Sequence, residues 1–227
     1  MLPKQVRIGL LDDHVIFRKT LKAYLSERTN FQVSLQAADF FELLGNLRET
    51  PIDVLLLDIF LPRMNGNDAV KLIRRDHPDI KIIVLSMTMD MDVIGSILDE
   101  GVQGFVSKAD EPEELVAAIE AAAGNKIYRN RIFTEALYWN SQYRHRPLTQ
   151  VRVQELNDRE KKIIQLIWEE KSNKEIADVL YLGVRSVEKI RQEIKEKTGA
   201  ASTVGVLKYA IEKRIITVAL NRTGIAQ

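Results

Sequence analysis

The sequence predicts two folds in one chain: a doubly wound α/β domain with five parallel strands, followed by an all-α domain of four helices. In the first half, apolar runs typical of strands alternate strictly with amphipathic helical patterns, and such alternation indicates a parallel sheet with helices on both faces. The second half holds only helical patterns. The charge changes too: residues 1–124 carry 13 basic and 20 acidic side chains, whereas residues 150–227 carry 15 and 11.

The composition fits a globular protein of one or two domains. The chain has 227 residues, of which 45% are hydrophobic and 29% are charged. It contains no apolar run long enough for a transmembrane helix, and residues 1–5 lack the apolar core of a signal peptide. Cysteine is absent, which excludes disulfides and thiol chemistry. We therefore expect a cytoplasmic protein.

The elements of the first domain follow from its hydrophobic pattern. The helix near residue 16 is expected to place Ile16, Leu21, Tyr24 and Leu25 on one side. Five strands in about 120 residues suit a flavodoxin-like domain with strand order 2-1-3-4-5. We expect strands at residues 6–11, 31–35, 53–58, 82–86 and 104–107, and helices at residues 16–25, 39–47, 67–75, 93–100 and 112–123.

Polar residues follow the strands that this order places side by side. In an open parallel sheet, ligands bind beyond the carboxyl ends of the strands. An aspartate at such an end can simply cap the next turn, but here several chemically related groups should gather at one edge. They are Asp12, Asp13, Asp58, Ser86 and Lys108.

This set of side chains limits the chemistry. Carboxylates crowded together repel one another unless a cation lies between them, and hard oxygen ligands suit Mg²⁺. Mg²⁺ favours phosphate oxygens as further ligands. A carboxylate beside Mg²⁺ and Lys108 can attack a phosphoryl group and become an aspartyl phosphate, to which Ser86 can donate a hydrogen bond.

The helical domain carries the pattern of a helix-turn-helix. Asn157 with Glu160, and Ser172 with Glu175, have capping-box spacing at the starts of two helices. A tight turn at residues 181–183 then leads into a helix over residues 184–197. The second helix of such a pair enters the DNA major groove. A last helix from residue 202 completes the domain.

Both halves resemble known bacterial domains. The first is similar to the receiver domain of two-component response regulators, and the second to the LuxR-type DNA-binding domain, so that the chain as a whole resembles the NarL/FixJ family. The residues that carry the resemblance are 11–14, 57–66, 84–87 and 104–108 in the first half, and 156–160, 172–177, 186–189 and 197–199 in the second.

The resemblance implies a role for each residue of the first site. Asp58 is the phosphoacceptor, and Lys108 pairs with the phosphoryl group or with Asp58. Ser86 and Phe105 form the switch pair. The implied ligands of Mg²⁺ are Asp12, Asp13, Asp58 and the backbone carbonyl of Phe60. His14 is interpreted as a surface residue at a helix start rather than as a phosphoryl carrier.

The resemblance also implies a transcription regulator that binds double-stranded DNA, is phosphorylated by a sensor histidine kinase, forms a homodimer when phosphorylated and has no membrane partner. The candidates for dimer contacts are Val206, Leu207, Ala210 and Ile211. The candidates for DNA contacts are Lys189, Arg191, Gln192 and Lys195, with Arg185 and Lys174 at phosphates.

Two other functions remain open on the sequence. One is a Mg²⁺-dependent phosphohydrolase of the aspartyl-phosphate type, although Phe60 stands where a second acidic residue would be needed. The other is a constitutive DNA-binding regulator with a silent receiver. The expected boundaries are residues 4–124 for the receiver, 125–153 for a linker, 154–216 for the helix-turn-helix domain and 217–227 for a tail.

The expected linker carries both basic and aromatic residues. Residues 132–139 can form a short helix. The basic residues around Arg144–Pro147, with their aromatic neighbours, either contact nucleic acid by charge and stacking or pack on one of the domains. We favour packing.

Overall fold

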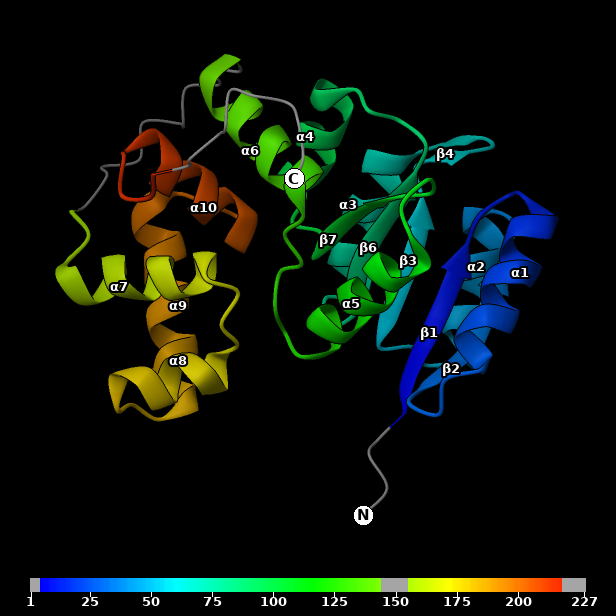
Figure 1. Cartoon of the computed structure of the whole chain (residues 1–227), viewed down its shortest axis with the longest axis horizontal. Coiled ribbons are helices and arrows are strands. Elements are labelled where there is room, and N and C mark those ends of the chain that lie inside the picture. Colours follow the sequence, from blue (N-terminus) through cyan, green and yellow to red (C-terminus); the bar gives the residue numbers. More distant parts are fainter. Residues whose placement is uncertain (1–4, 144–154, 218–227) are drawn as a thin grey trace. The chain divides into compact units, whose positions relative to one another are not determined.

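The computed structural model describes residues 5–143 and 155–217, and Figure 1 shows the elements along the chain. They form two compact units, one of residues 1–89 with 102–130 and the other of residues 90–101 with 131–227. Among the helices of the described residues, none is both long and apolar enough to span a bilayer. The basic residues around 144–147 in the expected linker lie outside the described residues, and so do residues 218–227 of the expected tail.

The first unit is built on a parallel sheet with strand order β2-β1-β3-β6-β7. This confirms the expected order 2-1-3-4-5, because a separate hairpin takes the labels β4 and β5. The register pairs Leu11 with Leu57 and Asp58 with Leu85, so β1, β3 and β6 end at one edge. The strands are β1 (Val6–Leu11), β2 (Phe31–Ala37), β3 (Val54–Asp58), β6 (Lys81–Ser86) and β7 (Gly104–Ser107).

Helices cover both faces of the sheet, as alternating side chains require. Ile8, Leu56 and Ile83 pack with apolar residues of α1 and α5 in one cluster, and their neighbours Leu55 and Val84 are just as buried on the opposite face. The helices of this unit are α1 (Val15–Ser26), α2 (Phe40–Leu47), α3 (Gly66–Asp76) and α5 (Pro112–Ala123).

One expectation for α1 is wrong. Ile16 is 82% exposed, and the adjacent Phe17 packs against the core instead. Successive helical residues point about 100° apart, so only one of the two can face the sheet. The larger apolar ring takes that position. Leu25 is buried, as expected.

A short hairpin carries the chain from the end of β3 to α3. Its strands are β4 (Phe60–Leu61) and β5 (Met64–Asn65), and Arg63 between them has a left-handed φ of 63°. Gly66 then begins α3 against the backbone of Ile59. A Cβ at Gly66 would lie 2.9 Å from the Ile59 Cα atom, so the close approach requires glycine.

The described residues of the second unit form helices and the turns between them. Within it, α6 packs on α4: Asn140 is buried, and its Nδ2 atom donates to the Gly95 carbonyl at 3.0 Å. The helix expected at residues 132–139 is confirmed and is longer. The helices are α4 (Met91–Asp99), α6 (Arg131–Tyr143), α7 (Asp158–Trp168), α8 (Asn173–Leu180), α9 (Val184–Thr198) and α10 (Thr203–Glu212).

Both expected capping boxes are present in the helix-turn-helix region. Asn157 and Glu160 cap α7, and Ser172 and Glu175 cap α8, each by hydrogen bonds in both directions. Tyr181 ends α8 in the left-handed conformation with φ 54°, and α9 begins directly after Gly183. α8 and α9 therefore form the expected helix-turn-helix.

Candidate functional site

The predicted polar edge of the sheet is a real cluster. Asp58 ends β3 and is 3% exposed, and Asp12, one residue after β1, is 4% exposed. Ser86 at the end of β6 is fully buried. Lys108 follows β7, and its backbone N–H donates to the Ser86 carbonyl at 2.9 Å. The fold of the strands thus brings residues from four separate parts of the chain together.

Lys108 neutralises the buried carboxylates of this cluster. Its Nζ atom lies 2.7 Å from Asp12 Oδ2 and 2.5 Å from Asp58 Oδ2. Burial by itself lowers the pKa of Lys108, but the hydrogen bonds and charges of Asp12 and Asp58 outweigh burial and raise the pKa above its usual value. The ammonium group is therefore charged at neutral pH, and it holds two acidic side chains in place.

The acidic groups also lie at distances that suit a cation. Ligand atoms of Asp12, Asp13, His14 and Asp58 all lie within 4.8 Å of one another. Asp13 is half-buried, whereas Asp12 and Asp58 are buried. Three carboxylates offer the hard oxygen ligands that Mg²⁺ favours. The residues therefore fit a Mg²⁺ ion.

His14 joins this group, which the sequence alone did not indicate. It is the N-cap residue of α1 and its side chain is exposed, in agreement with a residue at a helix start. Its Nδ1 atom lies 2.8 Å from Asp13 Oδ1, and its backbone N–H donates to Asp12 Oδ1 at 2.8 Å. The position of His14 beside two aspartates in the sequence is the signal that could have placed it here.

The second oxygen of Asp58 is held by the next turn. Its Oδ1 atom accepts a hydrogen bond from the backbone N–H of Phe60 at 3.0 Å, while Oδ2 faces Lys108. The Phe60 side chain is 60% exposed. The carboxylate is thus oriented by one backbone donor and one ammonium group.

Ser86 and Phe105, the expected switch pair, are both fully buried. Ser86 Oγ accepts from the backbone N–H of Thr88 at 3.2 Å. The Phe105 carbonyl accepts from Asn130 Nδ2 at 3.0 Å. β6 and β7 are paired, with Val84 opposite Phe105, so the hydroxyl and the ring lie on adjacent strands of the sheet.

Most of the candidate DNA-binding residues lie on the surface of the helix-turn-helix. Lys174 at the start of α8 is exposed, and so are Arg185, Lys189 and Gln192 on α9. Lys195 is half-buried. These side chains are available to a ligand of the second unit.

Arg191 points inward instead. Its guanidinium group donates to Asn173 Oδ1 and, at 3.1 Å, to Thr203 Oγ1. Burial lowers the pKa of Arg191, and the nearby charge of Glu188 opposes this effect in part. Arg191 thus ties α9 to the starts of α8 and α10. The alternation of charges along α9 could not reveal this, because the sequence does not show which arginine finds partners inside.

The candidate dimer residues are all buried within the unit. Val206, Leu207, Ala210 and Ile211 of α10 are at most 6% exposed. α10 contacts α4, α6, α7 and α9. These side chains belong to the packing of the second unit as the structure describes it.

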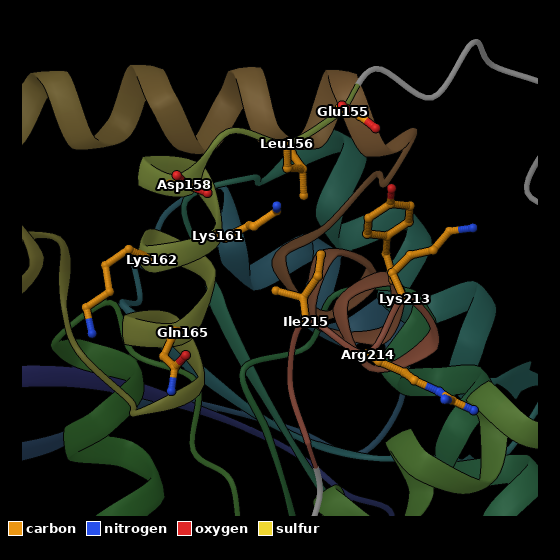
Figure 2. Close-up of a pocket in the computed structure, with 10 residues that line it drawn as sticks. Glu155, Leu156, Asp158, Lys161, Lys162, Gln165, Lys213, Arg214 and Ile215 are labelled. Atoms are coloured by element: carbon orange, nitrogen blue, oxygen red, sulfur yellow. The ribbon is translucent and has the colours of Figure 1, made fainter.

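A separate cavity of about 790 Å³ lies between α7 and the end of α10 (Figure 2). Its lining mixes the acidic Glu155 and Asp158 with four basic residues. Lys162, Lys213 and Arg214 extend in different directions in Figure 2, so they do not converge on one anion. The arrangement gives no defined chemistry.

Both halves match known families. Residues 8–120 match the model of the response regulator receiver domain, and residues 154–210 match that of bacterial regulatory proteins of the luxR family. The transcriptional regulatory protein MctR of Rhizobium johnstonii is 31% identical over 217 residues, which cover 94% of this chain and 96% of MctR. The transcriptional regulatory protein LiaR of Bacillus subtilis is 29% identical and covers 93% of this chain and 99% of its own.

Solved structures support the fold. The response regulator RcsB of Salmonella typhimurium is 22% identical with a TM-score of 0.57, over 91% of this chain and 98% of its own. The isolated receiver domain of RcsB, solved with a phosphomimetic, is 25% identical with a TM-score of 0.55 and covers 59% of this chain. The chain therefore belongs to the NarL/FixJ family of response regulators, which join a receiver domain to a LuxR-type DNA-binding domain.

Proposed function

We propose that Asp58 is the phosphoacceptor of this response regulator and that phosphorylation of Asp58 controls binding of the second unit to DNA. The observation that carries this proposal is the buried Asp58 carboxylate, with Lys108 Nζ at 2.5 Å and two further aspartates beside it. The proposed Mg²⁺ ligands are Asp12, Asp13, Asp58 and the Phe60 carbonyl. When bound, Mg²⁺ neutralises charge on the phosphoryl oxygens.

The residues have distinct tasks in phosphoryl transfer. An oxygen of Asp58 attacks phosphorus, and the bond from phosphorus to the donor breaks, so the donor keeps the bonding electron pair. The Lys108 ammonium stabilises negative charge on the phosphoryl oxygens, at the place where it now neutralises Asp58. The Ser86 hydroxyl, which accepts from Thr88 N–H, can donate a hydrogen bond to the phosphoryl group.

In the second unit, we place α9 in the major groove of double-stranded DNA. Lys189 and Gln192 are exposed on α9 and suit base edges, while Lys174 and Arg185 suit phosphates. Lys195 is half-buried, so it is less accessible to DNA than these exposed residues. The inward hydrogen bonds of Arg191 favour a positioning role over a direct contact.

The expected partners follow from this function. We propose a sensor histidine kinase as the phosphoryl donor and a homodimer as the phosphorylated form, acting on DNA in the cytoplasm. Pairing through Val206, Leu207, Ala210 or Ile211 requires that α10 first be uncovered, because these side chains are buried.

The two alternatives are less well supported. The family of the chain consists of transcription regulators, and Phe60 lies where a phosphohydrolase of this type would need a second acid. A silent receiver would not need Lys108 buried between two carboxylates, since taking charged groups out of water is costly even when they are paired.

The test of phosphoryl acceptance is the intact mass of the protein after incubation with acetyl phosphate and Mg²⁺. We expect one added phosphoryl group on the wild type and none on Asp58→Asn, because an amide is not a nucleophile for this reaction. Asp53→Asn changes the other end of the same strand and should keep the adduct. An adduct on Asp58→Asn, or none on the wild type, would contradict the proposal.

A further inference from the structure

One face of α9 is exposed to solvent. Its outward side chains recur every three or four residues, which places them along one stripe of the helix. Val187 and Ile194, between them, are buried against the rest of the unit. The stripe consists of Arg185, Glu188, Lys189, Gln192 and Glu196.

Arg191 helps to fix the orientation of α9 about its own axis, and with it the direction in which this stripe faces. Its guanidinium group donates to Asn173 at the start of α8 and to Thr203 at the start of α10. A helix held by two such bonds and by buried Val187 and Ile194 cannot turn about its axis without breaking them. Glu188 is therefore fixed on the outer face.

Glu188 differs from the other two acidic residues of α9 in its side-chain partners. Glu193 lies 3.7 Å from Lys189 Nζ, and Glu196 accepts from Gln192 Nε2 at 3.1 Å. Within residues 155–217, no hydrogen bond or ion pair joins Glu188 to another side chain. The charge of Glu188 acts at longer range on the inward-pointing Arg191, whose pKa it raises. Its carboxylate is exposed and ready to accept a hydrogen bond.

The position of Glu188 on the helix is important. It is the fifth residue of α9, and the N-terminal part of a recognition helix contacts base edges. A carboxylate between two phosphate chains is repelled, so it needs a donor on a base. Guanine offers only acceptors in the major groove, thymine offers O4 and a methyl group, and adenine has an acceptor beside its amino group. Cytosine offers the N4 amino group.

We infer that Glu188 is a specificity-determining residue, which selects a cytosine at one position of each DNA half-site by accepting a hydrogen bond from its N4 amino group. This inference rests on the proposed binding of α9 to DNA. The positive charges of Arg185 and Lys189 attract DNA of any sequence, while Glu188 adds a penalty when the base pair that it faces lacks the cytosine donor.

The experiment uses the full chain treated with acetyl phosphate and Mg²⁺. Sites are selected from a randomised DNA duplex, and the Kd is then measured for the selected site and its single-base variants. Wild type, Glu188→Ala and Glu188→Gln are compared with Glu196→Gln. This control removes one negative charge from the same stripe, but near the C-terminal end of α9.

For the wild type, we expect that replacing one selected cytosine weakens binding by roughly 5- to 100-fold. Glu188→Ala should lose this preference, and Glu188→Gln should favour adenine, which pairs with an amide. Both Gln variants should bind duplexes that lack the selected cytosine somewhat more tightly, since each removes repulsion from the phosphates. Only the Glu188 variants should change the selected sequence.

Two outcomes would overturn the inference, and they differ. If the wild type selects a sequence and both Glu188 variants select the same one with the same base preferences, Glu188 does not read cytosine, and the proposed DNA binding stands. If the wild type selects no sequence and binds all duplexes equally, the proposed sequence-specific function fails together with the inference.

Discussion

The acidic cluster of the receiver and the outer face of α9 organise charge in opposite ways. In the receiver, Asp12 and Asp58 are almost fully buried and share one ammonium group. On α9, Arg185, Lys189 and Glu188 are exposed. In the first region, the buried carboxylates share one internal ammonium group, whereas the second region presents most of its charges at the surface.

This difference predicts which mutations should lower stability and which should weaken DNA binding. A residue that compensates buried charge supports the fold as well as the chemistry, because its removal leaves an unpaired ion inside. A residue on an exposed helix face contributes little to stability, so its removal should appear in DNA binding. Substitutions of Lys108 and Arg191 test this division, and substitutions at two left-handed helix ends provide a smaller effect that does not depend on charge.

The largest effect is expected for Lys108→Gln. Loss of the ammonium leaves Asp12 and Asp58 facing each other, which should lower the free energy of unfolding by about 3 kcal/mol. Urea unfolding with and without Mg²⁺ measures this, and Mg²⁺ should restore part of the loss because it supplies positive charge at the same carboxylates. Lys71→Gln, on the exposed surface of α3, should change stability by less than about 0.5 kcal/mol. Equal stability of Lys108→Gln and the wild type would show that the cluster needs no compensation.

An intermediate effect is expected for Arg191→Lys in the second unit. A single ammonium cannot reproduce the hydrogen bonds of a guanidinium to both Asn173 and Thr203, so unfolding should become easier by about 1–2 kcal/mol. Lys189→Gln should leave thermal stability unchanged and weaken DNA binding. If the two variants behaved alike in thermal unfolding, Arg191 would belong to the exposed face after all.

The smallest effect concerns the left-handed helix ends. Tyr181 ends α8 at φ 54° and Gly199 ends α9 at φ 68°. Tyr181→Gly should stabilise the protein by about 0.5–1 kcal/mol, and Gly199→Ala should destabilise it by about 1 kcal/mol, since a Cβ is disfavoured in this conformation. Both shifts can be read from the midpoint of thermal unfolding. Shifts of the same sign would contradict the explanation.

The acidic cluster could be predicted from the sequence because the backbone determines it. Asp58 and Ser86 directly follow apolar runs. Adjacent parallel strands bring their carboxyl ends to one edge of the sheet, whichever rotamers the side chains adopt. The strand order and the capping boxes of α7 and α8 were predictable for the same reason: each depends on local pattern and spacing.

Side-chain direction on helices was harder to predict. Ile16 and Phe17 are both apolar, and only the packed core decides which one is buried. Arg191 resembles a surface cation until Asn173 and Thr203 are placed beside it. His14 joins the acidic group by its place at the start of α1. In each case the deciding partner lies on another element, or in a turn whose geometry the sequence pattern does not specify.

The most direct test of the account is the Kd of the full chain for its selected DNA, with and without acetyl phosphate and Mg²⁺. Asp58→Asn serves as the reference. Phosphorylation should strengthen binding by the wild type by about 5-fold or more, which is the usual scale of coupling between two sites, and should leave Asp58→Asn unchanged. Equal Kd values for phosphorylated and unphosphorylated wild type, with the adduct verified by mass, would contradict the claim that Asp58 controls DNA binding.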